Sequence, residues 1–141
     1  MERIKIVVIV GPTASGKTRL AIEIAERFNG EIVSADSRQV YRYMDIGTAK
    51  PTREDRKRVP HHLIDIVNPD DDFTAGRFRE EAVRVIQDIY GRGKNIFVVG
   101  GTGLYVKVLT NGLFKGPGGD ECLRAELRRM GGDNLYEKLK E

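Results

Sequence analysis

Four apolar runs alternate with amphipathic stretches along this chain of 141 residues. The runs are rich in β-branched residues, which predicts strands at residues 4–10, 31–35, 62–67 and 95–99. Between them, apolar residues recur every three or four positions, as they do on one face of a helix. Strands that alternate with helices favour a parallel sheet covered by helices on both faces. We therefore predict an α/β fold.

Three amphipathic helices are predicted from this spacing. The first ends at Asn29-Gly30, the second begins after an N-cap at Thr74 and ends in a glycine-containing turn, and the third ends at Asn111-Gly112. The predicted buried faces are Leu20, Ala21, Ile24, Ala25 and Phe28 in the first helix, Phe78, Ala82, Val85, Ile86 and Ile89 in the second, and Leu104, Tyr105, Val108 and Leu109 in the third.

The pattern changes after residue 112. The sequence Gly116-Pro117-Gly118-Gly119 predicts a linker, and the residues after it form a charged helical stretch interrupted by Gly131-Gly132. This stretch has few apolar residues with which to build a core. We therefore predict that residues 3–112 are the core domain and that residues 113–141 are a linker and the start of a further helical subdomain.

The first strand runs directly into Gly11-Pro12-Thr13-Ala14-Ser15-Gly16-Lys17-Thr18, which fits the phosphate-loop pattern G-x-x-x-x-G-K-[ST]. The two glycines let the backbone curl, Lys17 reaches the outer phosphates, and the Thr18 hydroxyl can bind Mg²⁺. The positive end of the following helix points to the same place. We therefore predict that Gly11 to Thr18 bind a polyphosphate, with Mg²⁺ as cofactor, in a P-loop NTPase-like, nucleotide-kinase-like core.

Polar residues follow two of the predicted strands. Because ligands in open α/β sheets lie beyond the carboxyl ends of strands, Asp36 is expected near the phosphate loop, as a general base or Mg²⁺ partner, as a helix cap, or as both. The last strand ends in Gly100-Gly101 instead of an acid, which argues against a hydrolytic ATPase or GTPase. Thr102 follows, where its hydroxyl can bind a phosphate or a base, or cap a helix.

The formal net charge of +3 is too small to indicate nucleic-acid binding by itself. Its distribution is uneven, since residues 38–58 contain seven Lys and Arg but only three acids. This basic segment is either a phosphate-facing surface or a solvated loop.

Cys122 is the only cysteine, so no intrachain disulfide can form and a reducing compartment fits. The adjacent His61 and His62 are expected in a loop or in core packing and not at a metal. The sequence shows neither a signal-peptide pattern nor an apolar run of membrane-spanning length. We expect a soluble cytoplasmic monomer with no membrane partner.

Five motifs together resemble the tRNA dimethylallyltransferase family, whose order they follow over nearly all of residues 3–124. They are the phosphate loop at 11–18, Asp-Ser-Arg-Gln-Val-Tyr-Arg at 36–42, Met-Asp-Ile-Gly-Thr-Ala-Lys-Pro at 44–51, Pro-His-His-Leu-Ile-Asp at 60–65 and Gly-Gly-Thr-Gly-Leu-Tyr at 100–105. The resemblance implies Mg²⁺-assisted transfer of a dimethylallyl group from dimethylallyl diphosphate to the exocyclic amine of the adenine beside the tRNA anticodon.

The resemblance also implies roles for individual residues. The phosphate loop would bind the donor diphosphate, with Lys17, Asp36 and Thr102 as catalytic residues and Asp36 as the base on the adenine amine. The tRNA contacts would be Asp36, Ser37, Arg38, Gln39, Thr102 and Arg124. Members of the family are longer than this chain, with a helical insertion that grips the anticodon stem and a C-terminal return to the core.

Three other functions are compatible with the residues. A P-loop kinase for a small metabolite or nucleotide would use ATP as donor, with Asp36 positioning an acceptor hydroxyl. A prenyltransferase of the cytokinin type would accept free adenine nucleotides. A catalytically incomplete fragment would bind nucleotide or tRNA without turnover.

Overall fold

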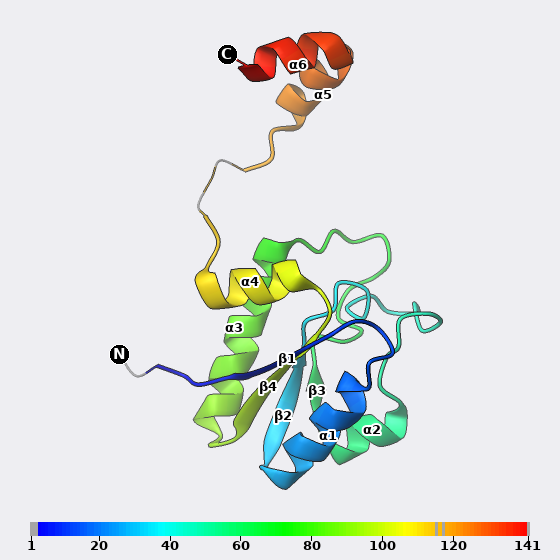
Figure 1. The fold of residues 1–141 in the computed structure, drawn as a ribbon, viewed down its shortest axis with the longest axis vertical. Helices are drawn as coiled ribbons and strands as arrows, with labels where there is room; N and C mark the ends of the chain where they lie inside the picture. The colour runs from blue at the N-terminus through cyan, green and yellow to red at the C-terminus, as the bar shows by residue number, and fades with distance from the viewer. Residues whose placement is uncertain (1–2, 115, 117, 141) are drawn as a thin grey trace.

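The structure is a computed structural model that describes residues 3–114, 116 and 118–140. Its centre is a sheet of four parallel strands in the order β1-β4-β2-β3 (Figure 1). The strands are β1 (Val7–Val10), β2 (Gly30–Ser34), β3 (His61–His62) and β4 (Asn95–Gly100). The predicted α/β fold with a parallel sheet and flanking helices is confirmed.

Helices cover both faces of the sheet. The described residues form α1 (Lys17–Arg27), α2 (Arg53–Arg58), α3 (Ala75–Gly91) and α4 (Gly103–Asn111) beside the sheet, and α5 (Glu121–Arg129) and α6 (Gly132–Lys140) beyond it (Figure 1). Successive residues of a strand point to opposite faces, so neighbours in β4 enter different cores. Val98 packs with α3 and α4 on one face, whereas Phe97 packs with α1 on the other.

The predicted strand at residues 62–67 is wrong in its extent. Only His61 and His62 pair with β2, because Leu63 and Asp65 adopt left-handed backbone conformations, with φ of 62° and 56°. A strand cannot continue through such residues. The chain returns to the strand direction only at Val67, which forms an isolated bridge with Tyr41.

Three residues assigned to buried helix faces are exposed. Leu20, Phe28 and Leu104 expose 49%, 57% and 58% of their surface. Phe28 lies at the C-cap of α1, beyond the regular helical turn, and Ile22 is buried in α1 instead. The sequence prediction also missed α2, although Thr52 and Asp55 form a capping box at its start.

The C-terminal helices α5 and α6 lie beyond a linker, away from the sheet (Figure 1). Neither contains a buried residue. Pro117, part of the predicted linker, lies outside the described residues. Within the described part of the chain, no helix combines the length and apolarity needed to cross a membrane.

Candidate phosphate and acceptor site

The phosphate loop connects β1 to α1 with alternating left-handed residues. Ala14 has a φ of 63° and Gly16 a φ of 82°, a conformation typical of anion-binding nests. In the described chain no side chain caps α1 at Gly16, so the first N–H groups of the helix remain available to ligand oxygens. Lys17 Nζ donates to the Pro12 carbonyl at 2.9 Å, which holds the ammonium over the loop.

The ends of β2 and β4 meet beside this loop. A Cβ on Gly100 would lie 2.2 Å from the Ala35 carbonyl oxygen, so only glycine permits this approach. The Thr102 backbone N–H then donates to the same carbonyl at 3.2 Å. The Thr102 hydroxyl does not cap α4 but accepts from the Ser37 backbone N–H at 2.9 Å and lies 3.3 Å from Ser37 Oγ.

Asp36 follows the end of β2 and supplies a carboxylate there. Its Oδ1 accepts from the backbone N–H groups of Arg38 at 2.8 Å and Gln39 at 3.3 Å, so it caps the turn that follows β2. The carboxylate also lines the pocket beside the phosphate loop. Capping and a chemical role are therefore compatible.

A pocket of about 410 Å³ joins the phosphate loop to an apolar surface. One side consists of the loop residues Thr13 to Thr18. The apolar contributions come from Ala21, Ile32, Ala49, Pro51, Ile64 and Val99. Two further residues that the sequence predicts at the site, Asp36 and Gln39, also line the pocket. The described lining does not include the other predicted site residues, which are Gly11, Pro12, Ser37, Arg38, Thr102 and Arg124. The pocket suits a ligand with both a phosphate group and a short hydrocarbon.

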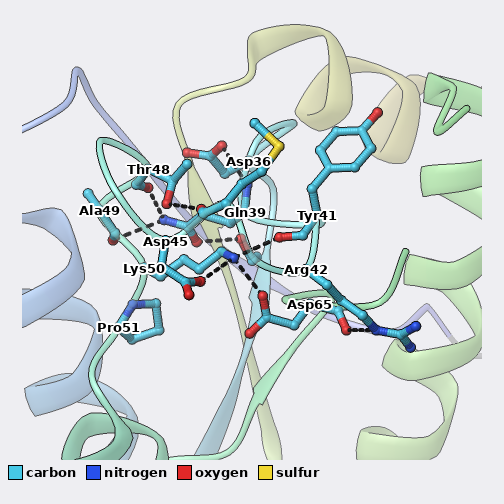
Figure 2. A network of polar contacts seen from close by, with 12 residues as sticks. Asp36, Gln39, Tyr41, Arg42, Asp45, Thr48, Ala49, Lys50, Pro51 and Asp65 are labelled. Atoms are coloured by element: carbon cyan, nitrogen blue, oxygen red, sulfur yellow. Dashed lines mark hydrogen bonds and ion pairs between the residues drawn. The ribbon is translucent and has the colours of Figure 1, made fainter. Parts of the chain in front are cut away.

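The loop of residues 41–51 is fixed by a network of polar contacts (Figure 2). Lys50 Nζ donates to the Tyr41 carbonyl at 2.7 Å, Asp45 Oδ1 at 2.8 Å and Asp65 Oδ1 at 2.6 Å. Arg56 bonds the other oxygen of Asp65 at 2.9 Å. Burial disfavours the charged form of Asp65, but Lys50 and Arg56 outweigh it and hold the pKa of that carboxyl below its ordinary value.

Most of the basic residues at 38–58 are bonded to other groups of the protein. Four of the seven have protein partners, namely Arg42, Lys50, Arg56 and Arg58. The sequence count missed the acids outside the segment, since Asp65 pairs with Lys50 and Arg56, and Glu26 pairs with Arg58. Arg38, Arg53 and Lys57 are the exposed cations that remain.

The two histidines point to opposite faces of the sheet. His61 lines the pocket, and burial lowers the pKa of its imidazole. His62 Nε2 lies 2.7 Å from Glu31 Oε2. No group of three or more potential metal-ligating His, Cys, Asp or Glu side chains occurs in the described residues.

Glu31 is a buried carboxylate at the start of β2, at the opposite end of the strand from Asp36. It is 2% exposed and pairs with Arg92 through both oxygens and with Lys94 at 3.0 Å. The hydrogen bonds from Arg92 hold the pKa of Glu31 well below its ordinary value, despite the burial. The sequence analysis did not single out this group.

Arg124 does not reach the pocket. It lies on α5, where Nη1 bonds Glu121 Oε1 at 2.9 Å on the exposed helix surface. Its contact with tRNA stays a prediction.

The sheet order, the nest at Ala14 to Gly16 and the pocket at the strand ends define a P-loop NTPase-like α/β fold, as predicted. A family model described as IPP transferase matches residues 39–141. The chain therefore belongs to the IPP transferase family.

Similar proteins of known name support this assignment. The tRNA dimethylallyltransferase of Geobacter metallireducens is 62% identical over 142 residues, which cover 98% of this chain and 46% of that protein. The tRNA dimethylallyltransferase 2 of Geotalea uraniireducens is 58% identical over 142 residues, with the same coverage.

Solved structures give the same result. The full-length tRNA isopentenylpyrophosphate transferase of Bacillus halodurans has a TM-score of 0.78 and 47% identity, over 97% of this chain and 47% of that one. A eukaryotic dimethylallyltransferase described as acting on tRNA has a TM-score of 0.84 and 34% identity, over 97% of this chain and 35% of that one. The chain thus spans about half the length of the curated relatives it matches.

Proposed function

We propose that this chain supplies the donor-binding and acceptor-activating core of a tRNA dimethylallyltransferase. The reaction moves a dimethylallyl group from dimethylallyl diphosphate to the exocyclic amine of the adenine beside the anticodon. The observation that carries the proposal is the pocket itself, in which the phosphate loop and six apolar residues share one cavity. The names of the relatives support the same assignment.

The bond changes fit the positions of the charged groups. The allylic C–O bond breaks and its electron pair leaves with the diphosphate, whose growing charge faces Lys17 and the N–H groups at the start of α1. The amine nitrogen forms the new C–N bond, and its proton passes to the Asp36 carboxylate at the pocket wall. Thr102 fixes the turn that carries Asp36 through its contact with Ser37.

A divalent cation, which we propose is Mg²⁺, fits the oxygen donors at the pocket. The described protein groups do not form a complete metal site. Mg²⁺ is commonly held by one or two protein oxygens together with substrate phosphates, and Thr18 supplies such a hydroxyl at the pocket wall. The ion would neutralise charge on the diphosphate.

The tRNA contacts are also proposals. Ser37, Arg38 and Asp36 lie on the turn after β2, beside the pocket, where an acceptor nucleotide would approach. Arg124 would contact tRNA if residues 113–141 begin the helical insertion that the longer relatives complete. Gln39 is 9% exposed, its side-chain amide bonds Thr48 and Ala49, and its backbone bonds Asp36 and Asp65, so its part in RNA binding would be to support the turn after β2.

The test is a transfer assay with competing donors. Residues 1–141 are joined to the C-terminal half of the Geobacter metallireducens relative and incubated with an anticodon stem-loop RNA. We expect label from dimethylallyl diphosphate in the RNA and none from γ-labelled ATP. The 141-residue chain alone is titrated with both donors, and we expect it to bind dimethylallyl diphosphate more tightly. Transfer of the γ-phosphate to any acceptor would support the kinase alternative instead.

A further inference from the structure

Four consecutive residues, Thr48, Ala49, Lys50 and Pro51, line the same pocket as the phosphate loop. We call residues 48–51 the outer wall. The outer wall is neither helix nor strand, so no regular backbone ladder holds it in place. Its position nevertheless sets how much room the apolar part of the pocket has, because Ala49 and Pro51 are part of that surface.

Gln39 holds the outer wall to the end of β2. Its amide Nε2 donates to the carbonyls of Thr48 and Ala49, both at 3.1 Å (Figure 2). Its Oε1 accepts from Ser34 Oγ at 3.0 Å. Both N–H donors of the amide are therefore used inside the protein. Ala49, whose carbonyl accepts one of these bonds, has a φ of 51°, a conformation that residues other than glycine seldom adopt.

Lys50 holds the outer wall from its other side. Its side chain is 5% exposed, and its ammonium has three acceptors, on Tyr41, Asp45 and Asp65. An ammonium has three N–H donors, so none remains for a ligand phosphate. Burial would lower the pKa of Lys50, but Asp45 and Asp65 outweigh it and raise that pKa above its ordinary value. Although Lys50 lines the pocket, its contacts are those of a structural anchor.

We propose that Gln39 and Lys50 are positioning residues that fix the outer wall and thereby limit the length of the hydrocarbon that the pocket accepts. The proposal rests on the proposed function, because it concerns the apolar group of a prenyl diphosphate. It gives Gln39 a role in donor selection, whereas the family resemblance implies a contact with tRNA. Without either anchor, the outer wall can move outward and admit a longer chain.

The test is the affinity of the 141-residue chain for three probes, measured by titration calorimetry. The probes are inorganic pyrophosphate, dimethylallyl diphosphate with five carbons, and geranyl diphosphate with ten carbons. The variants are Gln39→Met and Lys50→Met, which keep side-chain length but remove the hydrogen bonds. The matched controls are Gln87→Met on α3 and Lys107→Met on α4, where the same changes fall on exposed positions.

We expect the wild-type chain and both controls to prefer the five-carbon donor over the ten-carbon donor. In the two anchor variants, the ratio of the affinity for the five-carbon donor to that for the ten-carbon donor should fall about tenfold, because discrimination by pocket size is of this order. Pyrophosphate affinity should stay within about twofold in all five proteins, since the phosphate loop is unchanged. If Gln39→Met fails to fold, Ser34→Ala removes only the support of Gln39 and should give a smaller change in the same direction.

The two proposals fail in different ways. If the wild-type chain binds dimethylallyl diphosphate no better than pyrophosphate, the apolar subsite and the proposed function are both wrong. If it prefers the five-carbon donor and the anchor variants keep the same ratio of affinities, only the role of the anchors is wrong. A purely structural role would lower the unfolding temperature without changing that ratio.

Discussion

Thr102 and Ser37 join the carboxyl ends of β4 and β2. The Thr102 hydroxyl oxygen accepts from the Ser37 backbone N–H at 2.9 Å, and the two residues are 65 positions apart in the sequence. Asp36 directly precedes Ser37, so the contact holds the carboxylate relative to the start of α4. Thr102 thus affects the orientation of Asp36, whereas its hydroxyl makes no capping bond to α4.

Thr102→Val keeps the shape of the side chain but leaves the Ser37 N–H without its acceptor. We expect a loss of about 1 kcal/mol in the free energy of unfolding, measured with denaturant. In the fused, family-length protein, single-turnover prenylation should fall while donor affinity is unchanged. Thr102→Ser retains the hydroxyl and should behave as the wild type. Equal turnover of the Val and Ser variants would contradict this role.

Asp36→Asn separates the chemical role of Asp36 from its role as a cap. Asparagine retains an Oδ1 that can accept from Arg38 and Gln39, so the turn should survive. It cannot take up the proton of the amine, so turnover in the fused protein should fall by about 10² to 10⁴. Donor and RNA affinities should change little. Near-normal single-turnover prenylation would leave Asp36 as a cap or metal partner.

Lys17→Ala tests the phosphate loop. In the structure Lys17 donates to the Pro12 carbonyl of the loop itself, so its removal should leave thermal unfolding unchanged. Loss of a charge-assisted contact should weaken pyrophosphate binding by about 1.5 to 3 kcal/mol. Lys107→Ala, on the exposed surface of α4, is the matched control. Unchanged pyrophosphate affinity with normal unfolding would rule out Lys17 as a phosphate ligand.

The salt dependence of RNA binding tests the basic segment. Arg38, Arg53 and Lys57 are exposed, whereas the other four basic residues bond protein groups, although Arg42 and Arg58 are exposed as well. Each phosphate contact contributes about 0.7 to 0.9 to the slope of log affinity against log salt. Three contacts give a slope of about two to three for the 141-residue chain, measured by fluorescence anisotropy with a stem-loop RNA. A slope of six or more would show that the paired residues also contact phosphate.

Glu31→Gln should make the protein less stable at neutral pH but hardly at all in strong acid. The folded-state pKa of Glu31 is lowered from 4.5, so its stabilisation is present above that value and is lost as the pH falls through the folded-state pKa. At pH 7 the substitution should cost about 1.5 to 3 kcal/mol in unfolding free energy, as for hydrogen bonds to charged groups. The measurement is denaturant unfolding of the wild type and the variant at several pH values. A difference in unfolding free energy that stays constant down to pH 2 would contradict this role of Glu31.

The sequence predicts the parts of the site that depend on local backbone. The phosphate loop, the strand before it and the helix after it are contiguous, so spacing alone indicates them. The N-cap at Thr74 was likewise predicted, and its side chain accepts from Arg77 N–H in the structure. These features require no knowledge of distant residues.

The parts that depend on pairing across the fold were not predictable in the same way. Lys50 carries a charge that suggests exposure, yet its side chain is buried because Asp65 lies opposite it. The left-handed residues Leu63 and Asp65 have apolar and acidic side chains that give no local signal of a strand end. The Thr102 hydroxyl could be assigned to a cap, a phosphate or a base from sequence, but its partner Ser37 is known only once β2 and β4 are adjacent.

The strand order has a consequence for synthesis. β1 and β2 come first in the chain but are not neighbours, because β4 lies between them and pairs with both. The strand that supports the phosphate loop therefore lacks its sheet partner until residues 95–100 have left the ribosome. Contacts of such long sequence separation form late and slowly. Until then the apolar residues Val7–Val10 have no strand to pair with, so the pocket beside the phosphate loop cannot form before β4 is available.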